Sequence, residues 1–187
     1  MFNLAGGACR NTMIKSTHYM EYRLLLGLLL ALCACQNDKA DTYFANCRYG
    51  KPEAIFNASL PGVIEHDFRL KTKEGIERLR FESGKELTIV QAGCDSIRQD
   101  FQFYLPGSFP KADSGYWMEK AVEEFQQLGA LGNEYMMFSS WAQAIAAAGA
   151  SLQLTQSIEI QPGFYVRIDR VVSQDHANLL VTLSETP

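Results

Sequence analysis

The sequence has few of the residues that usually carry enzyme chemistry. It contains only three histidines, and it has neither a Gly-x-Ser-x-Gly nucleophile motif nor a Gly-x-Gly-x-x-Gly or Gly-Lys-Ser/Thr phosphate-binding loop. Its cysteines have no third and fourth metal ligands close by in sequence. The sequence therefore predicts no catalytic residues, no metal site and no cofactor, and we expect the protein not to be an enzyme.

Positive charge is also scarce. From residue 35 onward, 14 Lys and Arg stand against 20 Asp and Glu, which leaves a net charge of −6. A nucleic-acid-binding protein would show a basic face, so we expect no nucleic-acid partner. An acidic surface favours solubility and attracts cationic partners by long-range electrostatic steering.

The chain lacks an apolar run long enough for a permanent transmembrane helix. The leucine run at 24–32 is well short of the roughly 18–20 residues that a span needs. It follows Met20-Glu21-Tyr22-Arg23, so the segment has the cationic start and the apolar stretch of a secretory signal. A leucine-rich helix inside a cytoplasmic domain is the alternative, although the run is apolar on all sides. Met20 gives a tidier signal than Met1, and the true start stays open between them.

The residues that end this run, Leu32-Cys33-Ala34-Cys35, resemble the processing site of bacterial lipoproteins. That site has an aliphatic residue three positions before the modified cysteine and a small residue directly before it. The resemblance implies that Cys35 is diacylated and becomes the N-terminal residue, and that Cys33 is discarded. A cysteine at the second position is a departure from the usual pattern. Because Gln36 is not an aspartate, the resemblance also implies an outer-membrane anchor that faces the periplasm.

Cleavage at this point divides the chain into three parts. Residues 1–34 are the N-terminal extension and signal peptide, which are removed. Residues 35–42 are a lipidated tether, because the stretch after Cys35 is polar and lacks periodicity. Residues 43–187 form a single globular domain, and the mature chain of about 150 residues is long enough to bury a core.

Two cysteines remain once Cys35 carries lipid. Cys47 and Cys94 are an even pair in an oxidising compartment, where disulfides persist, and we expect them to be bonded. The bridge would join the N-terminal arm to the sheet and contribute about 3–4 kcal/mol in the chain-entropy model. The alternative is two free, buried thiols.

Hydrophobic residues alternate with polar ones in about seven segments, which predicts strands. The first begins at Val63, with Ile64 and His66 on one side. Two more form a hairpin around Ser83-Gly84, and a fourth ends at Pro106-Gly107. The last three lie on either side of Pro162-Gly163 and after the turn at 175–178, with Leu152 and Leu154 in the first of them.

Between the fourth and fifth strands the period changes from 2 to 3.6. One helix is predicted from a cap at Asp113 or Ser114 to Gly129 or Gly132, with Glu119, Lys120, Glu123 and Glu124 turned outward. A second is predicted over 134–148, where alanine favours helix. The order of four strands, two helices and three strands predicts an α+β domain with a mostly antiparallel sheet and both helices packed on one face.

Two histidines and one loop are the candidates for a site. His66 lies on an apolar strand face, where a hydrogen-bonded core histidine is the more common role. His176 lies in a turn beside Asp175, and neighbouring side chains in a turn rarely face each other. The stretch Leu105–Trp117 places Phe109, Tyr116 and Trp117 among turn residues, either as anchors for a protein partner or as plugs of the core.

These observations favour a protein-binding function. The first hypothesis is an outer-membrane-anchored lipoprotein that binds a cationic protein, as an immunity protein or inhibitor of a cell-wall-targeting toxin or lysozyme. The alternative is a structural or assembly lipoprotein of the envelope without inhibitory activity. A hydrolase that uses His66 or His176 is the weakest reading, because nothing specific in the sequence supports it.

Overall fold

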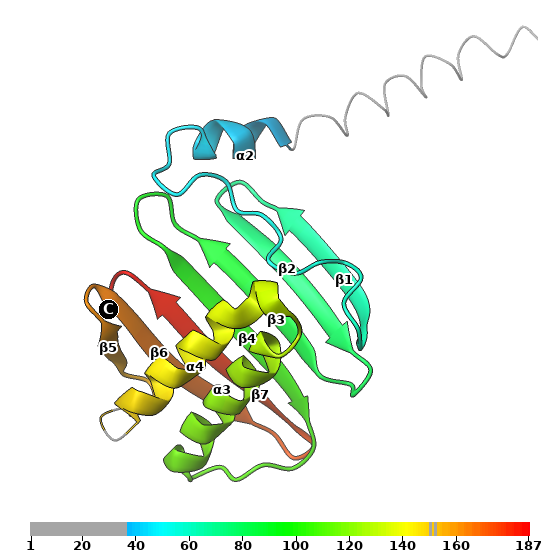
Figure 1. Cartoon of the computed structure of the whole chain (residues 1–187), viewed down its shortest axis with the longest axis vertical. Coiled ribbons are helices and arrows are strands. Elements are labelled where there is room, and N and C mark those ends of the chain that lie inside the picture. The colour runs from blue at the N-terminus through cyan, green and yellow to red at the C-terminus, as the bar shows by residue number, and fades with distance from the viewer. Residues whose placement is uncertain (1–36, 150, 152) are drawn as a thin grey trace, which may run out of the picture. The chain divides into compact units, whose positions relative to one another are not determined.

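A computed structural model of the chain describes residues 37–149, 151 and 153–187. Within this range a seven-stranded antiparallel sheet has the order β1-β2-β3-β4-β7-β6-β5, and helices α3 and α4 lie across one of its faces (Figure 1). The α+β class and the antiparallel sheet are therefore confirmed. The strands are β1 (Val63–Leu70), β2 (Glu74–Phe81), β3 (Glu86–Ala92), β4 (Arg98–Pro106), β5 (Ser157–Gln161), β6 (Phe164–Val172) and β7 (His176–Ser184). The helices are α2 (Asn37–Phe44), α3 (Ser114–Gly129), the short 3-10 helix η1 (Asn133–Tyr135) and α4 (Met136–Ala148).

The predicted signal peptide at 1–34, the predicted lipidation site Cys35 and Leu152 lie outside the described residues. None of the helices in the described part of the chain is long and apolar enough to cross a membrane.

A helix precedes the sheet where the sequence predicts a tether. Helix α2 starts at Asn37, so regular structure begins before the predicted domain boundary at Tyr43. Ala40 and Phe44 lie four residues apart and are 1% and 3% exposed, which gives this otherwise polar segment a buried side. The order along the chain therefore differs from the predicted one, because α2 comes before β1, and the four strands, the helices α3 and α4 and the three strands follow it.

The pairing of β4 with β7 joins two separate meanders. Strands β1–β4 and β5–β7 each fold back on themselves, and β4 pairs with β7 from Arg98–Ser184 to Pro106–His176. Helices α3 and α4 form the connection between the two meanders. Alternate residues of β4 and β7 then face the helices, which builds one core. The largest fully buried side chains include Phe101, Leu105, Trp117, Phe125, Phe138, Leu179 and Leu183.

Helix α3 begins and ends where the sequence predicts. The Asp113 carboxylate accepts a hydrogen bond from the Tyr116 backbone N–H at 3.0 Å, which satisfies one of the free N–H groups of the first turn. The helix ends at Gly129, which lies so close to Ser139 of α4 that a methyl group there would overlap the serine side chain. The absence of a side chain at Gly129 therefore lets the two helices approach at this end.

Strand β1 departs from regular alternation at its start. The pairing shifts between Val63 and Glu65, so a bulge falls at Ile64. Ile64 is 54% exposed, although simple alternation places it on the same side as His66. The extra residue of the bulge turns this side chain away from the core, which corrects the prediction from alternation.

The disulfide joins the segment after α2 to the turn between β3 and β4. Cys47 and Cys94 have Cα atoms 4.5 Å apart and are bonded through sulfur, as the sequence predicts. Close by, the Tyr49 hydroxyl donates to the Glu185 carboxylate, which in turn accepts from the Ile97 backbone N–H at 3.1 Å. The hydrogen bond from Tyr49 lowers the pKa of Glu185, and the same contact raises the pKa of Tyr49.

Loss of the disulfide should destabilise the domain. We expect the double variant Cys47→Ser/Cys94→Ser to unfold with a free energy about 3–4 kcal/mol lower than the wild type, because a loop with a sequence separation of 47 is no longer closed in the unfolded chain. Urea denaturation with and without reductant measures this difference. The wild type should lose stability on reduction and the double variant should not, and equal stability of all four samples would contradict the prediction.

Candidate functional site

The aromatic loop belongs mostly to the core. Trp117, predicted as a possible partner-binding residue, is 0% exposed, and its indole N–H donates to the Pro110 carbonyl at 2.9 Å. Its ring therefore cannot contact a partner, because it fills the space beneath α3. Phe109 and Tyr116 are half-buried beside it, with ring centroids 5.9 Å and 5.3 Å from that of Trp117. These two rings pack against the core.

The second histidine does contact its neighbour. His176 Nδ1 lies 2.8 Å from Asp175 Oδ1, so the sequence argument that adjacent side chains in this turn do not meet was wrong. Strand β7 begins at His176, whose ring stacks on that of Tyr104 with the centroids 5.2 Å apart. In this position the imidazole can still contact the Asp175 carboxylate. The hydrogen bond from His176 lowers the pKa of Asp175.

His66 reaches a buried carboxylate that holds the segment before β1. Glu77 of β2 is 0% exposed, and its Oε1 lies 2.7 Å from His66 Nε2. The same carboxylate accepts from the backbone N–H groups of Ile55 and Phe56 at 2.8 and 2.9 Å. Three groups on two chain segments thus share the buried carboxylate of Glu77. This is a structural use of the histidine, and it matches the role that the sequence favours.

A second buried carboxylate lies on α3. Glu124 is 2% exposed, although the sequence places it on the outer face of the helix. It falls three residues after Ala121 and one before Phe125, at the edge of the buried stripe of the helix. Two lysines compensate its negative charge there. Lys120 Nζ lies 2.9 Å from Glu124 Oε1, and Lys85 Nζ of the β2–β3 turn lies 2.7 Å from Oε2.

Lys85 and Lys120 are both engaged by carboxylates of α3. Partial burial acts to lower the pKa of Lys120, but its hydrogen bonds to Glu123 and Glu124 outweigh this effect and raise the pKa above its usual value. Beside it lies a mainly apolar cavity of about 320 Å³, which Phe81, Phe103 and Leu128 help to line. The lysines therefore attach α3 to the sheet and are not free to bind an anion.

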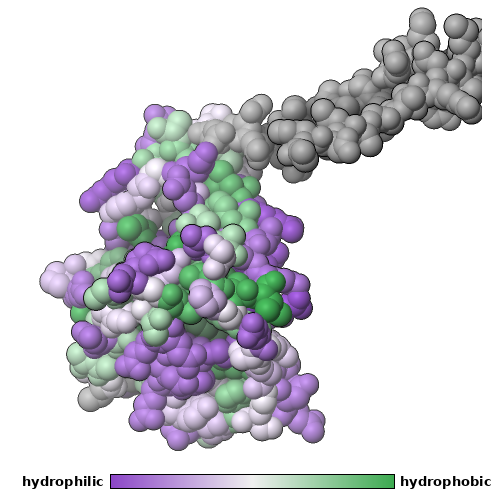
Figure 2. Space-filling model, turned by 45° about the vertical axis from the view of Figure 1, so that its right-hand side comes forward, coloured by the Kyte–Doolittle hydropathy of each residue, from purple (hydrophilic) through white to green (hydrophobic). Residues whose placement is uncertain are grey.

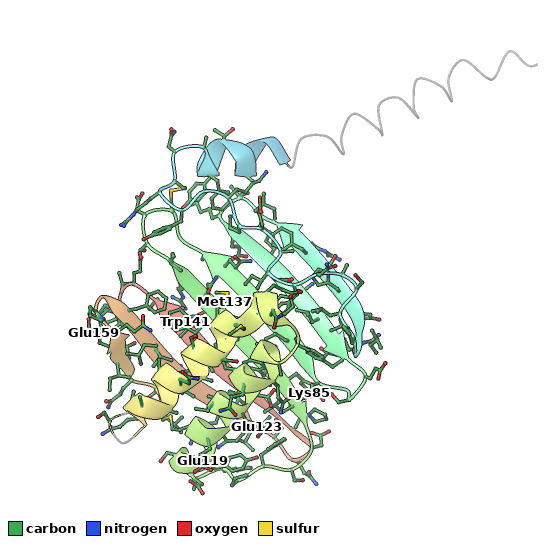
Figure 3. The ribbon with its side chains drawn as sticks, in the orientation of Figure 1. Lys85, Glu119, Glu123, Met137, Trp141 and Glu159 are labelled. Carbon is green, nitrogen blue, oxygen red and sulfur yellow. A yellow bond between two sulfur atoms is a disulfide. The ribbon has the colours of Figure 1, made fainter. Side chains whose placement is uncertain are left out.

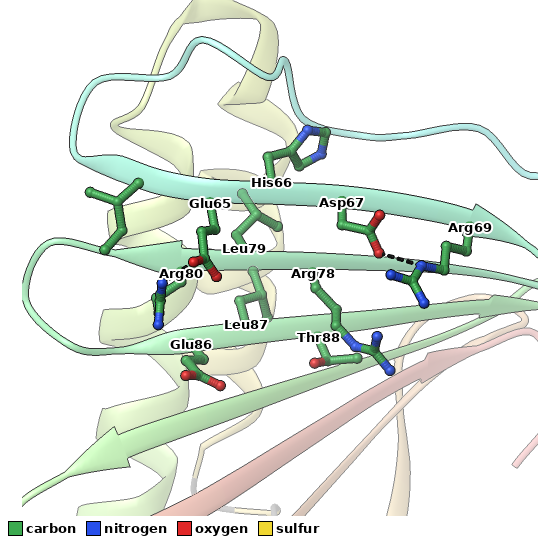
Figure 4. Close-up of a pocket in the computed structure, with 11 residues that line it drawn as sticks. Glu65, His66, Asp67, Arg69, Arg78, Leu79, Arg80, Glu86, Leu87 and Thr88 are labelled. Carbon is green, nitrogen blue, oxygen red and sulfur yellow. Dashed lines mark hydrogen bonds and ion pairs between the residues drawn. The ribbon is translucent and has the colours of Figure 1, made fainter.

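The face of the sheet opposite the helices is open and polar. Figure 4 looks onto this face, with strands β1, β2 and β3 in front and the helices behind. A hollow of about 560 Å³ lies there. Its charged lining residues are the acids Glu65, Asp67 and Glu86 and the arginines Arg69, Arg78 and Arg80. Arg69 Nε lies 2.8 Å from Asp67, and Arg80 pairs with Glu65. Because neither sign of charge dominates, this face offers no selectivity for a cationic or an anionic partner.

The exposed face of α4 has a different character. The chain has no Asp, Glu, Lys or Arg from residue 135 to residue 158, yet Met136 and Met137 are 63% and 47% exposed. Trp141, one turn after Met137, stacks on Phe164 with ring centroids 4.7 Å apart. A surface helix normally turns charged residues to solvent. Figure 2, which is turned by 45° from the view of Figure 1, shows hydrophilic residues over much of the surface and a hydrophobic patch near its middle.

A groove runs between α3 and α4 beyond their close approach at Gly129. Its volume is about 410 Å³, and its lining residues are Gly115, Met118, Glu119, Val122, Glu123, Gln126, Ile145, Ala146 and Gly149. Figure 3 shows Glu119 and Glu123 on α3 at one side of α4, and Glu159 on β5 at the other side. The uncharged face of α4 is thus bordered by carboxylates. We therefore take this face and its groove, together called the α4 surface, as the candidate functional site.

The sequence contained a signal for the α4 surface. The uncharged run at 135–158 and the alanine-rich stretch at 144–150 are both visible in it, but the alanine content by itself predicts only a helix. Among the residues that the structure describes, no group of three or more His, Cys, Asp or Glu is placed to hold a metal ion. Comparison of the chain with protein-family models, with curated proteins and with solved structures found no match.

Removal of the Glu77 carboxylate tests its structural role. We expect Glu77→Ala to lower the free energy of unfolding by about 2–5 kcal/mol, because it leaves two buried backbone N–H groups and a histidine without their acceptor. Glu74→Ala on the same strand is the control. It removes only a surface pair with Lys71 at 3.3 Å, which is worth about 0–1 kcal/mol. Urea denaturation measures both values, and a Glu77→Ala variant as stable as the control would refute this role.

Proposed function

We propose that this protein is a lipid-anchored component of the bacterial envelope whose domain binds a protein partner. The partner is cationic, and the proposed role is that of an immunity protein or inhibitor of a cell-wall-degrading toxin or lysozyme. The net charge of −6 after residue 35 supports a cationic partner through electrostatic steering.

The exposed, uncharged face of α4 carries the proposal. The cores of protein interfaces are depleted in Lys, Glu and Asp and enriched in Met and aromatic residues. This helix has that composition on its solvent side, with Met136 and Met137 well exposed. Methionine side chains are flexible and adapt to the surface of a partner. An isolated domain has no evident need for such a face, whereas a protein-binding domain does.

The anchor is supported by the lipoprotein-like motif at 32–35. A single lipid modification at Cys35 would place the binding domain at the membrane, where a toxin that attacks the cell wall from the periplasm must pass. The anchor would then hold the disulfide-bonded domain at the envelope, where the domain can bind the toxin.

Substitution of each cysteine in the motif tests the anchor. We expect Cys35→Ser to abolish incorporation of labelled palmitate and to release the protein from the membrane fraction, because the acylated sulfur is gone. Cys33→Ser is the matched control two positions away, and it should keep both properties. Loss of label in the Cys33 variant with retention in the Cys35 variant would reverse the assignment.

Affinity capture from envelopes tests the binding function. We expect the full, tagged chain to recover one protein in stoichiometric amount, and the variant Met136→Glu/Met137→Glu to bind the purified partner at least about tenfold more weakly, because two charges replace an apolar contact. Val171→Glu is the matched control. It changes a residue of similar exposure, 66%, on strand β6, and should bind as the wild type does.

The capture experiment and a deletion of the gene together distinguish the possible roles. If neither low nor high salt yields a stoichiometric partner, the domain is not a protein-binding module. For an immunity protein, deletion of the gene harms the cell only when the toxin is present. Envelope defects without any toxin would instead indicate the structural or assembly role.

A further inference from the structure

We infer that the groove between α3 and α4 receives a cationic amphipathic helix of the protein partner. The inference rests on the proposed protein-binding function and specifies which part of the partner enters the site. It starts from the shape of the groove. The helices nearly touch where Gly129 meets Ser139, and the groove of about 410 Å³ lies farther along them.

Small residues leave room for an inserted row of side chains. Gly115 on α3, Ala146 on α4 and Gly149 directly after α4 line the groove, and none of them projects a long side chain into it. Below them, Met118 and Ile145 are 8% and 0% exposed and form an apolar floor. A helix that lies in such a groove inserts residues spaced i, i+3, i+4 and i+7 from one apolar stripe. The floor provides the complementary apolar contact.

The lining of the groove contains two carboxylates, Glu119 and Glu123, and no lysine or arginine. Glu119 is exposed and forms no hydrogen bond or ion pair among the described residues. Glu123 shares the nearby Lys120, whose side chain is only 15% exposed and is bound to Glu124 as well. The α4 wall supplies no charge because residues 135–158 contain none. The partner must therefore bring the positive charge.

The partial charges at the helix ends near the groove do not change the negative sign of the local charge. Helix α3 begins at Ser114, where its macrodipole is positive, and α4 ends at Ala148, where its macrodipole is negative. The two partial charges oppose each other at the same end of the groove, and Asp113 already caps the positive one. The carboxylates on the rim thus dominate the local field and favour Lys or Arg beside the apolar stripe of the bound helix.

The same charges disfavour the other occupants. A second copy of the chain would bring a second acidic rim against the first, and an anionic membrane would place phosphates against the carboxylates. Both contacts join like charges. A cationic helix is the occupant that satisfies the apolar floor and the acidic rim together.

A leucine–lysine peptide with a helical repeat is the probe for this site. Its affinity is measured by fluorescence anisotropy for the full chain in nanodiscs of neutral phosphatidylcholine. We expect Ala146→Trp, which fills the groove, to weaken binding about tenfold or more, and Glu119→Lys to weaken it several-fold at low salt and less at high salt. The matched controls are Ala147→Trp, next to the groove on the same helix but not part of its lining, and Glu53→Lys, before the first strand. Both should bind within about twofold of the wild type, with circular dichroism used to check that all variants are folded.

Several outcomes would overturn the inference. Unchanged peptide binding by Ala146→Trp, or equal binding of a leucine–glutamate peptide, would exclude a cationic helix in the groove. Self-association of the wild type that Ala146→Trp abolishes would assign the groove to a second copy, and binding to anionic vesicles lost in the same variant would assign it to a membrane. If the captured envelope partner binds Ala146→Trp and Glu119→Lys normally, the groove inference fails and the protein-binding function stands. If no partner is captured in either salt, the proposed function itself fails.

Discussion

The rest of the fold depends on the pairing of β4 with β7. These strands come from two meanders that are separated along the chain by α3 and α4, and their buried cross-strand pairs, such as Phe101 with Val181 and Phe103 with Leu179, form the centre of the core. Because both helices belong to the connection between the two meanders, they are held against the same face of the completed sheet. The groove between them therefore depends on sheet assembly and forms only once β4 and β7 have paired.

Buried charge attaches the outer segments to this frame. Glu77 holds the segment before β1 through two backbone N–H groups and His66, and Glu124 connects α3 to the β2–β3 turn through Lys85. A buried carboxylate is tolerated only when its oxygens are satisfied, so each of these positions restrains the segments that it contacts. Glu124 has a second effect, because it shares Lys120 with Glu123, so this lysine does not fully neutralise Glu123 on the rim of the groove.

Local patterns predicted much of the fold, and non-local contacts account for what they missed. The alternation of β4 and β7, the Asp113 cap, the end of α3 at Gly129 and the cysteine pair were all visible in the sequence. The burial of Glu124 was not, because it depends on a lysine far away in sequence, and neither was the bulge at Ile64.

The candidate site was missed for a related reason. A groove between two helices depends on how closely they pack and which faces they turn to each other, and neither property can be read from periodicity alone. The predicted aromatic loop was a reasonable candidate on composition, but Trp117 fills the core. The uncharged run at 135–158 was the better guide, since the absence of charge on an exposed helix needs no knowledge of the fold to be noticed.

The exposure of Met136 and Met137 also means that the polarity of the α4 surface can be changed reversibly by oxidation and reduction. Accessible thioethers are oxidised to sulfoxides, which are polar and chiral, and methionine sulfoxide reductases restore them. A surface that suits a partner because it is apolar can thus lose that property through oxygen atoms added to two sulfurs, with no change in sequence and no unfolding. The binding strength of such a surface would follow the oxidative state of the compartment in which the protein works.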